Sequence, residues 1–304
     1  MAVQLAPNAL VDVATVLGEL GLGSDPTGSP ITRLTNVASA RIESYLQRSL
    51  VFAQRTEQYG VAGGPRPGRI QVKAHPIYPP AQASVLGVTL DLDPGSYDGS
   101  TVTLTPGEDW WLEDATRGWI FRQSRWPSTA LRRPDIVQDW DPDNVELTTQ
   151  ISYLAGFLTD VQIGAAGAWP GAAKTVAAGL LISPAAQPDQ VWCCTVAGTT
   201  GAAEPSWPAS PSAQFATQAD GSTVVWSFFG WSSSVATAPQ ARTLPWEIEQ
   251  AAIDAVVSWY RRRGQALEAT AEKFGDASQT YGTRLALPTT ALELLAPFRE
   301  IAIG

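Results

Sequence analysis

The stretch SPITRLTNVASARIESYLQRSL, residues 29–50, decides the helical part of the fold. Ser29 is a typical N-cap residue, and Pro30 suits the first position of a helix, where the missing N–H would have no helical partner. The apolar residues that follow recur at three- and four-residue spacing: Ile31, Leu34, Ala38, Ile42, Tyr45 and Leu46. The stretch therefore predicts an amphipathic helix that starts at Ser29 and Pro30 and buries one face.

Further helical patterns lie near both ends of the chain. In the first, Leu10, Val13, Leu17 and Leu20 share a face, and Gly21 is expected as the C-cap. Residues 244–264 (LPWEIEQAAIDAVVSWYRRRG) predict a longer helix that Pro245 begins and Gly264 ends. Its expected buried face consists of Ile248, Ala252, Ala255, Val256, Trp259 and Tyr260. Residues 289–303 (TTALELLAPFREIAI) predict a final helix that Pro297 kinks or ends.

Between residues 51 and 157 the apolar spacing changes to every second residue. RIQVK (69–73), SVLGVTLDL (84–92), TVTLT (101–105), DWWLE (109–113) and GWIFR (118–122) are separated by Gly, Pro, Asp and Ser. This pattern is typical of antiparallel strands. Residues 109–122 predict a hairpin that turns at 115–118, and VELTTQISYLAGF (145–157) predicts one more strand.

Residues 158–241 differ sharply in composition from the rest of the chain. Lys174 is their only basic residue, and Gly, Ala, Ser, Thr, Pro and Trp dominate. Strand-like patches occur at VWCCTV (191–196) and STVVWSFFG (222–230). We expect an α+β protein, in which residues 1–157 and 242–304 form one discontinuous domain and residues 158–241 form an inserted all-β module.

The totals narrow the class of protein. The 304 residues suit about two domains, and a net charge of -9 does not suit wrapping nucleic acid, because phosphate binding needs a positive field. The two cysteines, Cys193 and Cys194, are adjacent, so a bridge between them would be strained and free thiols are expected. We expect a soluble protein of a reducing compartment, without a signal peptide or membrane anchor.

The candidates for catalysis are few. His75 is the only histidine and lies in a Pro-rich connection, where a structural or surface role is expected. Four carboxylates flank two tryptophans, an arrangement that a glycosidase could use: Glu108, Asp109, Glu113 and Asp114. A solvated, charged hairpin edge that guards against aggregation explains them more simply.

Residues 139–144 (DWDPDN) open like a calcium-binding loop. Asn144 stands where such a loop needs Gly, and Gln150 stands where it needs a bidentate Glu, so a polar turn is expected. The sequence therefore predicts no catalytic residue, no metal site and no cofactor.

Three consecutive arginines, Arg261, Arg262 and Arg263, follow Trp259 and Tyr260. One interpretation is that cations near a helix C-terminus stabilise the helix dipole. The other is contact with an acidic partner or with DNA phosphates, and the acidic chain favours a protein partner. Because consecutive helical residues spread around the axis, at least one arginine should face a partner or an acid.

Several motifs outside residues 158–241 occur in an order typical of one family. The helix predicted in residues 29–50 carries Ala38, Ser39, Ala40, Arg41, Ile42, Glu43, Tyr45, Leu46 and Arg48. The strand that precedes residues 158–241 ends in Tyr153, Gly156 and Phe157. The helix after it carries Leu244, Pro245, Ala251, Ala252, Trp259, Tyr260, Arg261 and Arg262, and LPTTALELLAPFRE closes the pattern. In this order, over most of residues 8–157 and 242–304, the motifs resemble the head–tail connector (adaptor) proteins of long-tailed phages.

The block at 158–241 departs from that family, which has only a few residues there. Its marks are Trp169, the turn at 197–201, Glu204-Pro205, Trp207-Pro208, Asp220-Gly221 and Trp226. They resemble the small carbohydrate-binding-like β modules of phage tail and fibre proteins. Trp192 and Trp226, in predicted strands, are expected in the core, whereas Trp207, in a Pro-rich turn, is expected as an exposed glycan platform.

The resemblance implies a helical connector core with antiparallel strands, interrupted by a small all-β domain. It implies a structural virion protein of the neck, made in the host cytoplasm, that forms a ring of usually twelve copies under the portal. Expected partners are the portal protein, the next neck or tail-completion protein, other copies of the chain, and DNA that passes without sequence-specific binding; no membrane is expected. By analogy, the contact residues are Leu292, Leu295, Phe298, Arg299 and Ile301.

Two other interpretations of the sequence stay open. A glycan-binding or glycan-cleaving virion protein would have the β module as its active part. A neck protein could also join a neighbouring ring instead of the portal. For the ring itself, the acidic composition suits DNA passage, because a like-charged lumen does not hold DNA.

Overall fold

The computed structural model describes residues 3–27, 29–59, 68–91, 101–123, 126, 149–211, 213–221, 223–232, 239–269 and 286–299. The side chains of residues 91 and 263–269 lie outside this description. The fold is α+β, as the sequence predicts, and the chain divides into two compact units. One consists of residues 1–51, 158–165 and 242–304; the other consists of residues 52–157 and 166–241. We call them the helical unit and the β unit.

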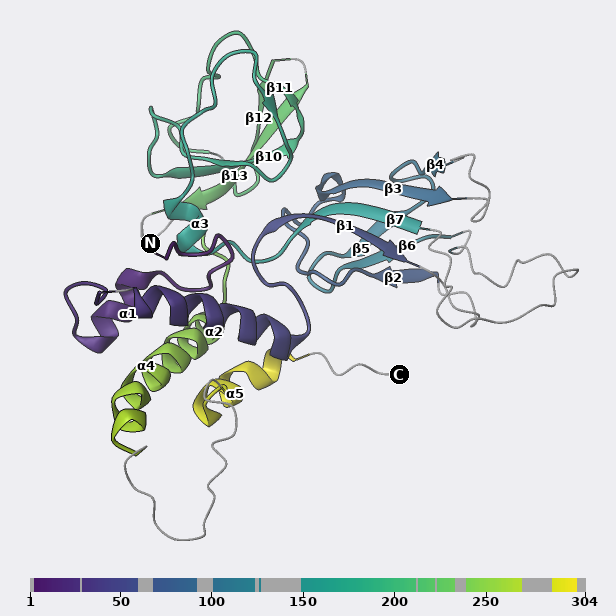
Figure 1. Ribbon diagram of the computed structural model, residues 1–304. Coiled ribbons are helices and arrows are strands. Elements are labelled where there is room, and N and C mark those ends of the chain that lie inside the picture. The colour runs from purple at the N-terminus through teal and green to yellow at the C-terminus, as the bar shows by residue number, and fades with distance from the viewer. Residues whose placement is uncertain are drawn as a thin grey trace, which may run out of the picture. The chain divides into compact units, whose positions relative to one another are not determined.

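The helical unit gathers segments from both ends of the chain and a short piece of its middle. Its elements are α1 (Val13–Leu20), α2 (Pro30–Leu46), α3 (Asp160–Gly164), α4 (Trp246–Ala269), α5 (Thr289–Leu295) and the 3₁₀ turn η3 (Ala296–Phe298). Helix α4 packs against α1, α2 and α5 (Figure 1). Among the described residues, no helix combines the length and the apolar character needed to cross a membrane.

Helix α2 begins at Pro30 as predicted, but Ser29 does not cap it. Ser29 has a left-handed backbone (φ 52°) and makes no side-chain cap bond. The carboxylate of Asp25 accepts the first-turn N–H groups instead, from Ile31 at 3.1 Å and from Thr32 at 3.0 Å. The cap prediction was wrong because a preceding loop delivers a charged acceptor to the same orphan donors.

Helix α4 does not end at Gly264, as the sequence predicts, but continues to Ala269. Glycine within a helix costs only about 1 kcal/mol, which does not force an ending. The predicted buried face is confirmed for Ile248, Ala252, Ala255, Val256 and Trp259, while Tyr260 is half-buried. At α1, Gly21 caps the C-terminus with φ 67°, as predicted.

The first part of the β unit is a pair of antiparallel sheets (Figure 1). One has the order β1-β7-β3-β4, and the other has the order β2-β6-β5. The strands are β1 (Ala53–Tyr59), β2 (Arg69–Gln71), β3 (Val85–Asp91), β4 (Thr101–Thr103), β5 (Trp111–Asp114), β6 (Trp119–Phe121) and β7 (Thr149–Ala155), with the 3₁₀ turn η1 (Gln82–Ser84) before β3. The predicted hairpin is confirmed as β5 and β6. Both sheets contribute to one apolar core, which includes Val88, Trp110, Ile120, Ile151 and Tyr153.

Residues 166–241 contribute two more sheets to the β unit. One has the order β12-β13-β10-β9, and the other pairs β11 with β8. The strands are β8 (Thr175–Val176), β9 (Leu181–Ile182), β10 (Gln190–Val196), β11 (Gly198–Thr199), β12 (Thr217–Asp220) and β13 (Val224–Trp231). The two patches expected as strands are β10 and β13, which pair with each other. We call this part the small β module.

Aromatic side chains join the small β module to the first part of the β unit. Phe229 packs edge-on against Phe52 with ring centroids 5.2 Å apart, and Phe215 packs against Tyr78 at 5.6 Å. Phe215 and Phe229 also contact each other at 5.7 Å. Removing residues 158–241 would therefore expose two aromatic rings of the part that remains, which makes such a deletion a poor test of function.

Candidate functional site

The residues considered for catalysis serve local structure. His75 is 7% exposed, and two of the four candidate carboxylates accept nearby backbone N–H groups. Asp109 accepts the N–H of Thr105 at 2.7 Å, and Asp114 accepts the N–H of Arg117 at 3.0 Å. Glu113 forms a bidentate ion pair with Arg69, which lowers the pKa of the glutamate. These contacts favour the charged hairpin edge over a paired catalytic site.

The described part of the chain contains no candidate metal-binding site. No group of three or more His, Cys, Asp and Glu side chains there could hold an ion. The calcium-like segment at 139–144 lies outside the described residues.

The adjacent cysteines are free thiols, as predicted, and both are buried in β10. Burial raises the pKa of Cys193 well above its ordinary value, and Cys194 adds to the effect. Burial, followed by the negative charge of Asp220, raises the pKa of Cys194 to about 11. Because the thiolate is the reactive form, neither residue is suited to nucleophilic or redox chemistry in the native state.

The small β module uses its tryptophans to build a core. Trp192 and Trp226 are fully buried, as predicted. The expectation that Trp207 is an exposed platform is wrong: it is 7% exposed and packs on Trp192 with ring centroids 5.0 Å apart. Its indole N–H donates to Glu204 Oε1 at 2.8 Å. A Pro-rich turn looks solvent-exposed locally, but here it folds back over the sheet and covers it.

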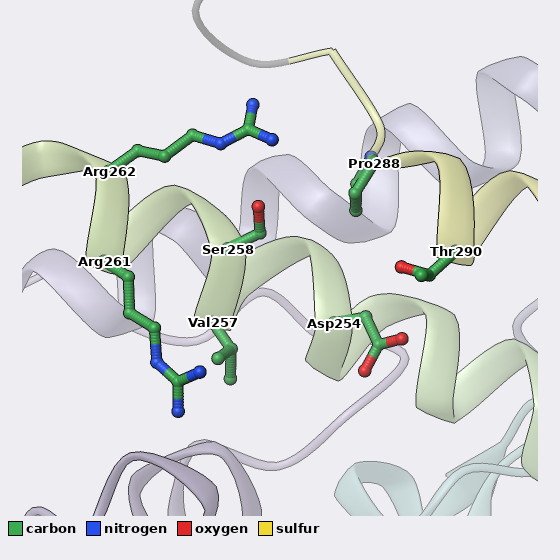
Figure 2. Close-up of a pocket in the computed structure, with 7 residues that line it drawn as sticks. All are labelled: Asp254, Val257, Ser258, Arg261, Arg262, Pro288 and Thr290. Carbon is green, nitrogen blue, oxygen red and sulfur yellow. The ribbon is translucent and has the colours of Figure 1, made fainter.

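The predicted arginine cluster borders a surface groove on the helical unit. The groove has a volume of about 350 Å³ and lies between the middle of α4 and the start of α5 (Figure 2). Its lining residues are Asp254, Val257, Ser258, Arg261, Arg262, Pro288 and Thr290. Arg262 extends past Ser258 toward Pro288, whereas Arg261 leaves α4 on the side of Val257 (Figure 2). The side chain of Arg263 lies outside the described residues.

Both described arginines of the groove are exposed, and none of the ion pairs within the described ranges involves them. The helix dipole does not explain them either. They lie seven and eight residues before the end of α4 at Ala269, whereas dipole stabilisation is confined to the last turn. Without an ion pair among the described residues, Arg261 and Arg262 suit a carboxylate-bearing partner, and the hydroxyl residues Ser258 and Thr290 line the same groove.

The residues expected to contact the portal have unequal access to a partner. Leu295 is fully buried, so it supports the fold of the helical unit and offers no contact surface; its prediction is corrected. Leu292 and Phe298 are half-buried. Arg299 is exposed, with its guanidinium 5.1 Å from the ring centre of Tyr45. Ile301 lies outside the described residues.

A second surface feature, which the sequence patterns above do not predict, lies at the start of α4. Trp246 is 65% exposed, and the guanidinium of Arg242 lies 3.5 Å from the centre of one of its rings. Arg242 is itself held by two carboxylates, Glu249 at 2.6 Å and Asp160 at 3.0 Å. Helical phase could have indicated this exposure, because position 246 lies opposite the buried face that contains Ile248.

Comparison with known proteins gives a distant structural likeness. No family model and no curated protein matches the chain. A chain from the "Neck of empty GTA particle computed with C6 symmetry" aligns with 100% of this chain and 95% of that chain. The TM-score is 0.44 and the sequence identity is 12%. At this distance the likeness assigns no function to the present chain.

Proposed function

We propose that this chain is a structural protein of a phage neck, which forms a ring under the portal, joins head to tail and lets DNA pass. The observation that carries the proposal is the packing of the motif-bearing helices. Three separate segments that resemble the connector family fold as α2, α4 and α5, and α4 packs against both of the others. Motifs that are weak one by one therefore make one helical unit.

The fourth motif supports the same interpretation through its structural roles. Tyr153 is fully buried, and its hydroxyl donates to Glu57 at 2.7 Å and accepts the N–H of Ala74 at 3.1 Å. Gly156 has φ 107°, a conformation that favours glycine. The Tyr-x-x-Gly-aromatic pattern thus ends β7 and ties three segments together, which is a reason for it to recur in proteins that share this architecture.

The small β module, in this proposal, is an insertion that decorates the neck. Its own sheet and its own core of Val176, Ile182, Trp192, Trp226 and Phe228 support an independent origin for the small β module. Trp207, the residue expected to bind a glycan, is buried. The glycan-binding alternative therefore lacks the exposed aromatic platform that it requires.

The test is sedimentation velocity of the full chain, alone and mixed with the portal protein encoded in the same genome, followed by electron microscopy of any complex. A ring of about twelve copies on the narrow end of the portal is the expected result. A chain that forms no ring, alone or with portal, would contradict the proposal. A ring that ignores the portal but binds another neck component would move the protein to a neighbouring neck position.

A matched pair of variants on the C-terminal segment tests the portal contact separately. Arg299→Glu reverses the exposed cation after η3 and should weaken portal binding at least tenfold without changing ring formation. Glu293→Lys reverses an exposed charge on α5 and serves as the control. The two variants change the charge in opposite directions, so equal losses of portal binding would contradict a specific contact through Arg299.

A further inference from the structure

The exposed face of α4 changes character from one end to the other. Its first turn carries Trp246 and the exposed acid Glu247, and its later turns carry Arg261 and Arg262. With 3.6 residues per turn, positions 246, 250, 254, 257 and 261 fall within about a quarter of the helix circumference. They form one stripe that starts at Trp246 and finishes at Arg261 in the groove, and the acid Glu247 borders its start.

The start of the stripe is held in place by contacts within the same copy. Trp246 is stacked under Arg242, and Arg242 is fixed by the buried carboxylate of Glu249 and by Asp160. Large aromatic side chains that are ordered in the free protein lose little conformational entropy on binding, which is one reason why Trp and Arg are enriched among binding hot spots. Trp246 is therefore well suited to anchor a protein contact.

The far end of the stripe has the complementary charge. The groove holds two guanidinium groups against one carboxylate, Asp254, which accepts a hydrogen bond from Gln250 at 2.8 Å. Its Val257 and Pro288 offer apolar surface beside the charge. An aromatic side chain next to an acid meets both requirements.

Within one copy the two ends cannot meet. Glu247 and Arg261 are fourteen residues apart on a continuous helix, which corresponds to about 21 Å along its axis. Two different surfaces that complement each other on separate copies form a head-to-tail contact, which closes into a ring when the rotation per copy allows it.

We infer that Trp246 and Glu247 of one copy dock in the Arg261–Arg262 groove of the next copy. This inference rests on the proposed ring and names the contact that builds it. Local charge complementarity is the reason for choosing a second copy as occupant: the chain presents Glu247 beside its exposed tryptophan at one end of α4 and two arginines in the groove at the other.

Charge exchange in the full-length protein tests the contact. Glu247→Lys reverses the docking end, and Arg261→Glu with Arg262→Glu reverses the groove. Each variant alone should lose at least tenfold in ring affinity by sedimentation velocity. An equimolar mixture should recover rings in which the two variants alternate, because each reversed docking end then meets a reversed groove and each native docking end meets a native groove. Trp246→Ala should also weaken assembly, because it removes the docking side chain. The substitution should leave the fold intact, since the indole lies outside the core.

The controls separate folding from assembly. Arg33→Glu with Arg41→Glu reverses two exposed charges on α2 and should assemble like wild type. Circular dichroism and urea unfolding verify that each variant is folded, and recovery in the mixture cannot come from unfolded chains.

The outcomes distinguish this inference from the neck function. Wild-type rings together with normal rings from every variant would overturn the α4 contact and leave the neck function standing. Rings from the groove variant that no longer bind portal would assign the groove to the portal, which also overturns the inference. Recovery only of two-copy species would show a symmetric contact instead of a head-to-tail one. A wild-type chain that never forms rings contradicts both proposals.

Discussion

Asp220 accepts the indole N–H of Trp169, 51 residues away in the sequence, at 2.8 Å. The same oxygen accepts the indole N–H of Trp226 at 3.1 Å, and the other oxygen accepts the N–H of Gly201 at 2.7 Å. A Cβ on Gly201 would lie 3.1 Å from the backbone nitrogen of Gly221, so the two turns approach closely. Trp169, Gly201, Asp220 and Trp226, which are four of the marks of the small β module, thus share one hydrogen-bonded centre.

Asp220→Asn should destabilise the small β module by at least about 2 kcal/mol. The amide nitrogen of Asn cannot accept, so either the two indole N–H groups or the Gly201 N–H would lose their acceptor inside the protein. Urea unfolding followed by tryptophan fluorescence measures the change. Asp189→Asn, at an exposed position of the same module, is the control and should change the unfolding free energy by less than about 0.5 kcal/mol.

Gly230→Ala should cost about 3 kcal/mol or more. Gly230 has φ 146°, and a Cβ there would lie 2.5 Å from the backbone nitrogen of Ala241, which a side-chain rotation cannot relieve. Gly171→Ala provides a matched comparison, since Gly171 also has positive φ (99°) but open space around its Cβ direction. Thermal unfolding of the two variants should separate steric overlap from backbone strain, and equal losses would show that strain alone matters.

The thiols of Cys193 and Cys194 should be almost inert in the native protein. With the pKa of Cys194 at about 11, its thiolate fraction near pH 8 is about a hundredfold below that of an ordinary cysteine. Both thiols should react with an aromatic disulfide reagent only after denaturant is added, and then at the ordinary rate. Rapid reaction of one thiol without denaturant would show that β10 opens locally.

Sequence reasoning found the elements whose signals are local. The period-two segments became β3, β5, β6 and β7, and the stripe that starts at Ile31 became α2. It failed where a distant part of the chain decides the result. The burial of Trp207 depends on a sheet whose strands lie on both sides of it in the sequence. The residues of its own turn do not indicate that the sheet will bury it.

The candidate interaction surface was predictable in part. Arg261 and Arg262 stood out as a cation cluster, and the structure places them on a groove. Trp246 was missed although its helical phase separates it from the buried face. The two ion pairs of Arg242 could not be predicted from any sequence pattern, because their carboxylates come from α3 and α4, at residues 160 and 249.

Asp25→Ala should destabilise the helical unit by about 1–2 kcal/mol, because it removes the acceptor of two first-turn N–H groups of α2. Ser29→Gly should be neutral or slightly stabilising, since Ser29 has φ 52° and glycine adopts that conformation without strain. Urea unfolding monitored by circular dichroism at the helical band compares the two. The opposite ranking would restore Ser29 as the cap.

Glu249 should make the stability of the helical unit depend on pH. Burial raises the pKa of its carboxyl above the ordinary value of 4.5; Arg242 opposes this shift, and Asp160 adds to it. The folded state therefore binds a proton more readily than the unfolded chain. Because the folded state holds more protons in that window, this contribution to the unfolding free energy is largest at low pH and is lost as pH rises through the raised pKa.

Glu249→Gln removes this titration while keeping an oxygen that can accept from Arg242. The unfolding free energy of wild type, minus that of the variant, should therefore increase as pH falls from about 7 toward the ordinary glutamate value. Urea unfolding at several pH values measures this difference, in which the titration of all other groups largely cancels. A difference that stays constant with pH would mean that Arg242 compensates fully for the burial of Glu249. A difference that decreases as pH falls would mean that Arg242 dominates and that the pKa of Glu249 is lowered.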